Sequence, residues 1–274
     1  LQGSVLPELG LWGTVEGLEG SEVGALWPET EGALRGRLSL AIQSGGTWKN
    51  PRISGDATLE GGKFSGVTVD RASGRFYFTP AMLKVVGLEA SLFGASLRGT
   101  LGLGLSHLPP DVTLQMRGAQ VDLAQVAQAF PVLGDLQGMV EKISLDLKGS
   151  GSALDGRMTL VAPSLSGRGH KLEQVAADVK LRDGKTFHVA ARAQGLGSPL
   201  TLSGTASWGK KIDMNLDFKA TKLDLARLEA LFPELRELKP RGEASVAVTL
   251  KGDPGAPQIS GIVSAPQIIL AGET

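Results

Sequence analysis

The residues of this chain that could do chemistry are few, and its three histidines come first. His107, His170 and His188 are far apart in the sequence, whereas acid–base catalysis needs groups that converge on one reacting atom. His188 lies on the polar side of an alternating run and is predicted to face solvent from a strand. The histidines therefore indicate neither a catalytic centre nor a metal site.

Two glycine-containing runs resemble parts of nucleotide-binding loops, but neither motif is complete. Gly184-Lys185-Thr186 matches the end of a phosphate-binding loop, yet Val179 stands where the first glycine of that motif belongs. Gly99, Gly102 and Gly104 do not form the Gly-x-Gly-x-x-Gly pattern that leads from a strand into a helix. We predict a hairpin turn at Gly184 and, for the other three glycines, positions on the outer side of a curving strand.

Composition excludes several further classes of function. The chain has 28 basic and 28 acidic residues without a basic stripe, which disfavours a nucleic-acid partner. It has no cysteine, and acidic residues such as Asp213 and Asp217 alternate with lysines rather than clustering at calcium-loop spacing. We therefore expect no enzymatic activity, no cofactor and no bound metal.

A long-period repeat organises the chain. A large apolar residue followed by proline recurs at Leu26-Trp27-Pro28, Ala129-Phe130-Pro131 and Leu231-Phe232-Pro233, and the prolines are 103 and 102 residues apart. Such fixed spacing is typical of repeat architectures. No window has the 18 apolar residues of a membrane span, and the first residue is Leu. We expect a piece of a longer array, whose membrane anchor and targeting signal lie elsewhere.

Each repeat is predicted to contain one short helix. Asp122 and Asp224 stand at helix N-cap positions, apolar residues follow at helical spacing, and the proline ends each helix. Beyond the prolines, Gly36, Gly138 and Gly242 each open an alternating run. The predicted units are a partial repeat at 1–35, complete repeats at 36–137 and 138–241, and a partial repeat at 242–274.

Most of the remaining sequence alternates polar and apolar residues, which is typical of strands with one buried face. In the clearest case Ile212, Met214, Leu216 and Phe218 alternate with charged and amide side chains. Gly61-Gly62, Asp183-Gly184 and Gly209-Lys210 are predicted hairpin turns, so the sheet is expected to be an antiparallel meander.

The apolar side of this sheet needs a covering layer. A helix of about nine residues is only about 14 Å long and cannot cover the strands of one repeat. The sheet must therefore pack on a second sheet, close on itself, or curl into an open trough. We predict an all-β fold with a short helix per repeat, in which an elongated, curled antiparallel sheet encloses a hydrophobic groove. A dry, closed core remains the alternative.

The chain resembles a known family. Leu123-Ala124-Gln125-Val126, Phe130-Pro131-Val132-Leu133 and the run from Ile143 to Gly149 are similar to the repeating unit of the AsmA-like superfamily, which includes TamB. The likeness covers about residues 20 to 270, and the copy from Leu223 to Gly261 is the closer match. The resemblance implies a periplasmic protein of a diderm bacterium, anchored in the inner membrane and folded as a β-taco. It also implies phospholipid acyl chains as cargo and an outer-membrane barrel partner of the TamA type.

The alternating runs supply the candidate lipid-binding residues. These floor positions are Leu38, Leu40, Ile42, Val112, Leu114, Met116, Ile143, Leu145, Leu147, Ile212, Met214, Leu216, Phe218, Val246, Val248 and Leu250. Aliphatic and Met side chains offer apolar area to acyl chains without requiring hydrogen bonds. A second hypothesis is a scaffold whose exposed strand edges template client β-strands during outer-membrane protein assembly.

Overall fold

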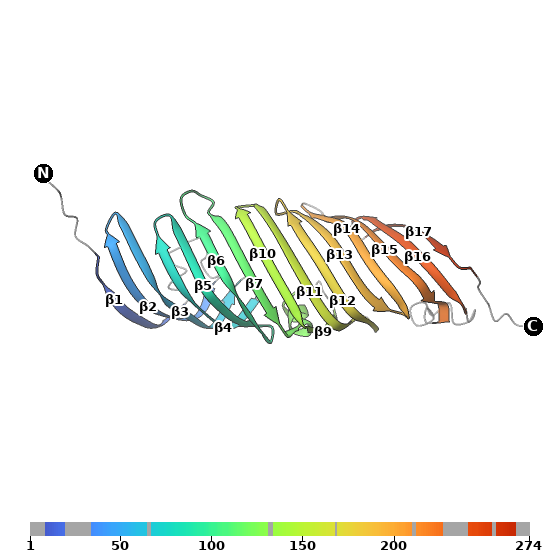
Figure 1. Ribbon diagram of the computed structural model, residues 1–274, viewed down its shortest axis with the longest axis horizontal. Coiled ribbons are helices and arrows are strands. Elements are labelled where there is room, and N and C mark those ends of the chain that lie inside the picture. The colour runs from blue at the N-terminus through green and yellow to red at the C-terminus, as the bar shows by residue number, and fades with distance from the viewer. Residues whose placement is uncertain are drawn as a thin grey trace, which may run out of the picture.

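The computed structural model describes residues 9–19, 34–64, 67–130, 134–167, 169–209, 212–226, 241–253 and 256–266. Most of them lie in strands, which cross the long axis of the molecule obliquely (Figure 1). The strands are β1 (Trp12–Glu19), β2 (Leu34–Thr47), β3 (Asn50–Phe64), β4 (Val67–Thr79), β5 (Met82–Leu92), β6 (Ala95–Gly104), β7 (Asp111–Ala119), β8 (Val121–Asp122), β9 (Gln137–Val140), β10 (Lys142–Ser150), β11 (Ala153–Gly167), β12 (His170–Arg182), β13 (Thr186–Gly195), β14 (Ser198–Trp208), β15 (Ile212–Asp224), β16 (Glu243–Gly252) and β17 (Gln258–Ser264).

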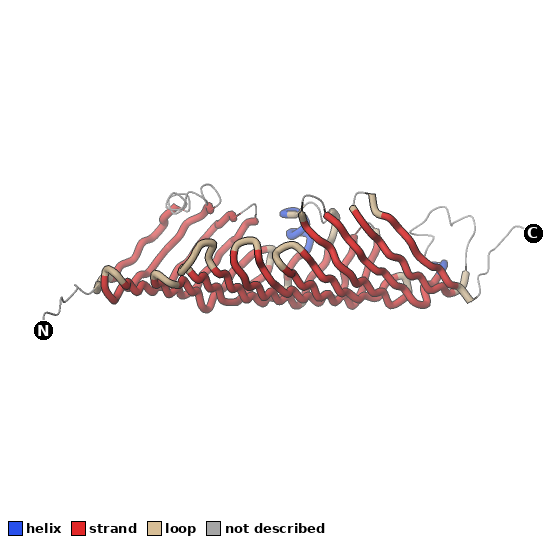
Figure 2. Tube along the Cα trace, turned by 90° about the horizontal axis from the view of Figure 1, so that it is seen from above, coloured by secondary structure: helices blue, strands red, loops and turns tan. Residues whose placement is uncertain are grey.

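The long strands form one antiparallel sheet in chain order. Each pairs with the next from β1 to β7, and again from β10 to β17. β7 pairs directly with β10, so β8, the helix α2 (Leu123–Ala129) and β9 form an excursion from the ladder. The sheet is long and open, which confirms the predicted all-β antiparallel architecture (Figures 1 and 2).

The pairing registers give the sheet an apolar face and a polar face. Across β7, β10 and β11 the residues Met116, Leu145 and Met158 lie opposite one another, and the neighbouring row is Gln115, Asp146 and Arg157. We call the apolar side the inner face and the polar side the outer face. Because side chains alternate between the faces of a strand, each apolar row continues from strand to strand.

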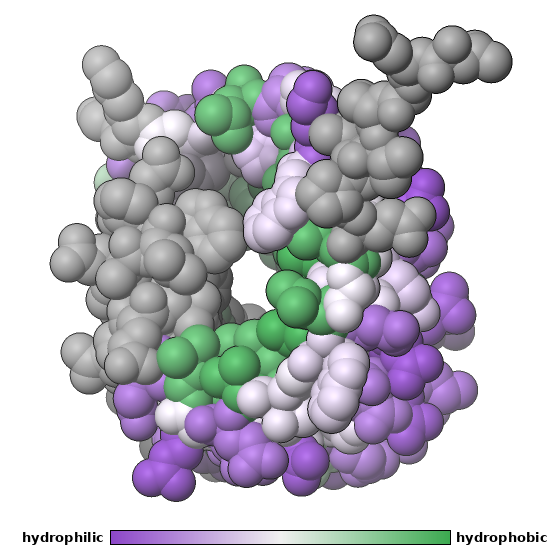
Figure 3. Space-filling model, turned by 90° about the vertical axis from the view of Figure 1, so that its left-hand side faces the viewer, coloured by the Kyte–Doolittle hydropathy of each residue, from purple (hydrophilic) through white to green (hydrophobic). Residues whose placement is uncertain are grey.

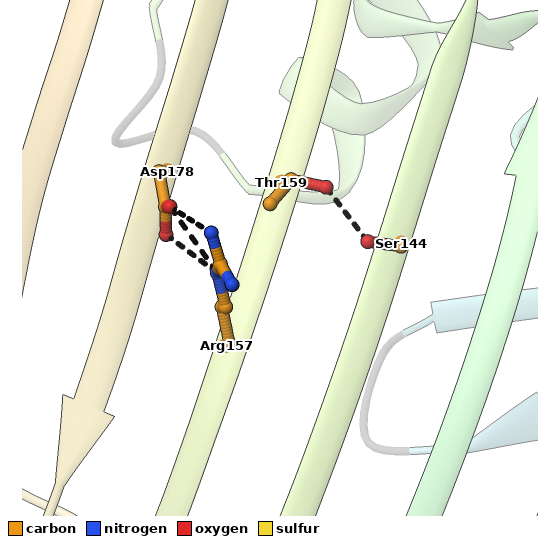
Figure 4. A network of polar contacts seen from close by, with 4 residues as sticks. All are labelled: Ser144, Arg157, Thr159 and Asp178. Atoms are coloured by element: carbon orange, nitrogen blue, oxygen red, sulfur yellow. Dashed lines mark hydrogen bonds and ion pairs between the residues drawn. The ribbon is translucent and has the colours of Figure 1, made fainter.

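Ion pairs between neighbouring strands stabilise the outer face. Arg157 on β11 donates from Nε to Asp178 Oδ1 on β12 at 3.1 Å, and the Ser144 and Thr159 hydroxyls hydrogen-bond at 2.7 Å (Figure 4). Arg98 pairs with Glu89 at 3.0 Å in the same cross-strand manner. These side chains are solvated, so each pair adds little to the free energy of folding. Their charges keep the outer face polar.

One of these pairs predicts a small pH dependence. Hydrogen bonds from Arg157 hold the pKa of Asp178 below its ordinary value. A depressed carboxyl pKa stabilises the fold above the unfolded-state pKa of about 4, and that contribution disappears as the pH falls through the folded-state pKa. We expect Asp178→Asn to lower the thermal midpoint slightly at neutral pH and to have no effect in strong acid. Thermal melts at both pH values test this, with the exposed Asp213→Asn as control.

The excursion between β7 and β10 contains the predicted capped helix. Asp122 is the N-cap of α2, and its Oδ1 accepts a hydrogen bond from the Ala124 backbone N–H at 2.9 Å. The same contact recurs in the next repeat, where Asp224 Oδ1 accepts from the Ala226 N–H at 3.0 Å. This confirms Asp122 as a helix cap and shows that Asp224 makes the same local contact. The helix expected near Phe232 and the Trp27-Pro28 segment lie outside the described residues.

The three glycines that open the alternating runs share an unusual backbone conformation. Gly36, Gly138 and Gly242 have φ values of 117°, 134° and 119°, a region that other residues rarely adopt. Local geometry as well as sequence therefore recurs at the repeat period.

Two predictions about other glycines were wrong. Gly61-Gly62 is not a hairpin turn but part of β3, where the pairing with β2 shifts register opposite Gly36. Two adjacent glycines suit a β-bulge as well as a turn. Gly99 is on the inner face opposite Met116, whereas Gly102 and Gly104 are on the outer face as predicted. By contrast, Asp183-Gly184 is the predicted turn between β12 and β13. β14 and β15 pair as the turn predicted at Gly209-Lys210 requires, although Lys210 lies outside the described residues.

Candidate functional site: the inner face of the sheet

The pairing registers place all the predicted floor residues on the inner face. They come from β2, β7, β10, β15 and β16, and facing pairs include Leu114 with Leu147 and Leu216 with Leu250. Strands that the sequence did not single out extend the same surface, for example Leu101 on β6 and Val189 on β13. The apolar surface therefore runs along the whole ladder.

The inner face is apolar but is not a closed core. None of the predicted floor residues is fully buried, and Ile212 is 37% exposed. The end view in Figure 3 shows a hollow whose described wall is largely hydrophobic, while the outer surface is hydrophilic. Within the described part of the chain the short β8–β9 pair packs on one rim, and no second sheet spans the rest of the inner face. The arrangement is an open groove lined by aliphatic side chains.

Glycines opposite large residues let the sheet curl around this groove. Gly99 lies opposite Met116, Gly156 opposite Leu147, and Gly204 opposite Leu216. A Cβ added to Gly99 would collide with the backbone carbonyl oxygen of Gln115 and lie 2.6 Å from the Met116 sulfur, so a side chain there would force the backbone to shift. Where no side chain is present, the larger neighbour folds over the glycine and the strands can bend more sharply.

One region of dry packing lies where the excursion covers one rim of the groove. Val121 and Val140 of the β8–β9 pair are 6% and 1% exposed, and they pack with Ala162 and Val175 of β11 and β12. The Asp122 N–H donates to the Phe93 carbonyl oxygen at 3.0 Å. The ring centroids of Phe93 and Phe130 are 6.4 Å apart. The helical segment therefore packs over part of the groove.

The sequence analysis missed two residues that pack against the buried clusters of the sheet. Phe93 and Leu196 occupy equivalent strand turns with φ of 53° each, and Leu196 packs against a second cluster of Leu200, Ala220 and Leu223. A positive φ is unusual for large apolar residues. The available signal was an apolar residue followed by glycine, which recurs 103 residues apart at Phe93-Gly94 and Leu196-Gly197.

The histidines do not assemble a reactive centre. His107 Nε2 lies 3.1 Å from Asp111 Oδ2, and both side chains are exposed. His170 is the first residue of β12, and His188 is exposed on the outer face as predicted. Among the described residues no group of three His, Cys, Asp or Glu side chains could hold a metal ion. The chemistry that the inner face can offer is apolar contact.

Comparison with family models, curated proteins and solved structures finds no match to this chain. In the portion of the chain that the structure describes, no helix has the length and apolarity to cross a bilayer. The fold alone defines the class, an elongated and open antiparallel sheet of repeat-like construction with an apolar inner face.

Proposed function

We propose that this chain is a lipid-conducting segment of an AsmA-like envelope protein, which shields phospholipid acyl chains in its groove between the inner and outer membranes. The observation that carries the proposal is the continuous apolar inner face that remains accessible along the sheet. Leaving such a surface in water is unfavourable by roughly 25 cal/mol per Å². An acyl chain that occupies the groove removes that cost while keeping itself out of water.

The lining suits passive movement rather than tight binding. Aliphatic side chains such as Leu145, Leu216 and Val248 offer no hydrogen bonds that would hold a lipid at one position. Neighbouring positions along the groove are therefore close in energy, and an acyl chain can slide between them. In this proposal the segment is periplasmic, performs no chemical step and needs no cofactor.

Photo-crosslinking tests whether lipid occupies the inner face. A photoreactive amino acid at Leu216 on the inner face should crosslink phospholipid in bacterial envelopes, and the same group at Asn215 on the outer face should not. The two positions are consecutive on β15 and differ mainly in the face they occupy. Native mass spectrometry of the purified chain would identify the attached lipid.

Other outcomes would contradict the proposal. Equal labelling at both positions would indicate nonspecific contact with membranes, and no labelling at either would indicate a groove that excludes lipid. Specific capture of client β-strands by a lipid-free chain would favour the scaffold function instead.

A further inference from the structure

The outer face carries two aromatic side chains in one cross-strand row. Trp12 on β1 pairs with Gln43 on β2, Gln43 pairs with Ser54 on β3, and Ser54 pairs with Tyr77 on β4. Of the strand side chains that the structure describes, these are the only aromatic ones on the outer face. The others lie on the inner face, among them Phe76, Phe78, Phe187, Trp208 and Phe218. The row is therefore an exception to the polar pattern of this face.

A shallow depression of about 460 Å³ lies between the two rings. Trp12 is 88% exposed and Tyr77 is 42% exposed, so part of each side chain is accessible to a ligand. The lining between them is polar and includes Thr14, Gln43 and Ser54. Exposed aromatic rings on either side of hydrogen-bonding groups favour a ligand with both apolar faces and polar edges.

An ion pair completes the lining. Arg75 donates from Nε to Asp56 Oδ1 at 2.9 Å and from a terminal nitrogen to Oδ2 at 3.2 Å. This hydrogen bonding lowers the pKa of Asp56 and so favours its ionised form. The paired charges cancel, while the carboxylate lone pairs and the remaining guanidinium N–H groups can still bond hydroxyls. Lys84 lies on the far side of Tyr77, outside the depression.

We propose that this depression binds a neutral, linear oligosaccharide. Pyranose rings would stack on Trp12 and Tyr77 through their C–H faces, while their hydroxyls bond to the polar side chains between. The two aromatic residues are three strand spacings apart, roughly 14 Å, so a chain of about three sugars would cross the strands at right angles. A polyanion such as a nucleic acid is disfavoured because the only cation in the lining is already neutralised by Asp56. This site is separate from the groove and does not depend on the proposed function.

Titration of the full 274-residue chain with cellotriose, chitotriose and maltotriose tests the proposal. Ligand-observed NMR and tryptophan fluorescence should detect binding of at least one of these trisaccharides. Because stacked aromatic residues carry much of the affinity in such sites, Tyr77→Ala should weaken binding about tenfold or more. Tyr77→Phe, which keeps the ring, should bind nearly as the wild type does. Trp48→Ala is the matched control, since Trp48 is 71% exposed in a turn outside the depression.

Two results would overturn the proposal. The first is the absence of binding by any of the three sugars, and the second is unchanged affinity in both Trp12→Ala and Tyr77→Ala. Far-UV circular dichroism of each variant separates loss of the site from loss of fold. Since β4 is an internal strand, Tyr77→Ala remains informative even if Trp12→Ala loosens the edge strand β1.

Discussion

Leu216→Asp is expected to remove lipid from its part of the groove without unfolding the protein. Leu216 lies at mid-length of β15 on the inner face, and its side chain is only partly buried. A carboxylate there can stay hydrated while the groove is empty, but acyl chains that cover it would strip its water at a cost of several kcal/mol. We expect phospholipid crosslinking from a probe at Val248, on the adjacent strand, to fall about tenfold or more.

Leu223→Asp is the matched control for this substitution. Leu223 is on the same strand but is 4% exposed, in the dry cluster with Leu200 and Ala220. A charge buried there without a partner should cost about 4 kcal/mol or more and unfold that part of the sheet. If Leu216→Asp unfolds the protein as severely as Leu223→Asp, the inner face is a closed core and the proposed function fails.

The faces of the strands were predictable from sequence because side-chain alternation is local. Leu114, Leu145 and Met214 all lie on the inner face, since each belongs to a run with the period-2 pattern that one buried face imposes. The helix cap at Asp122 was also predictable, because one side chain and one backbone N–H two residues later define it.

What sequence could not provide is the register between strands. The row that joins Trp12 to Tyr77 depends on three successive pairings, each fixed by the packing of other residues. The direct pairing of β7 with β10 likewise separates the excursion from the sheet; the sequence predicts the helix between them but not the pairing of the strands on either side. Gly61-Gly62 shows the same limit, since a turn and a bulge need the same residues and only the partner strand decides between them.

The curl of the sheet predicts the second large effect, the loss of stability in Gly204→Val. Gly204 has a φ of 145°, and an added Cβ would collide with the carbonyl oxygen of Asn215 on the neighbouring strand. Backbone strain of about 1–3 kcal/mol adds to overpacking of about 1–3 kcal/mol. We expect the thermal midpoint to fall sharply, as followed by circular dichroism.

Gly45→Ala separates this effect from the general consequence of replacing a strand glycine. Gly45 is in β2, its φ is not in the positive region, and an added Cβ would meet no atom within 4 Å. The alanine reduces the freedom of the unfolded chain, so stability should stay the same or rise slightly. Equal midpoints for Gly204→Val and the wild type would mean that the sheet can relax around a side chain at Gly204. In that case the glycines opposite large residues would not be what keeps the groove curved, and its shape would have to come from the rim caps alone.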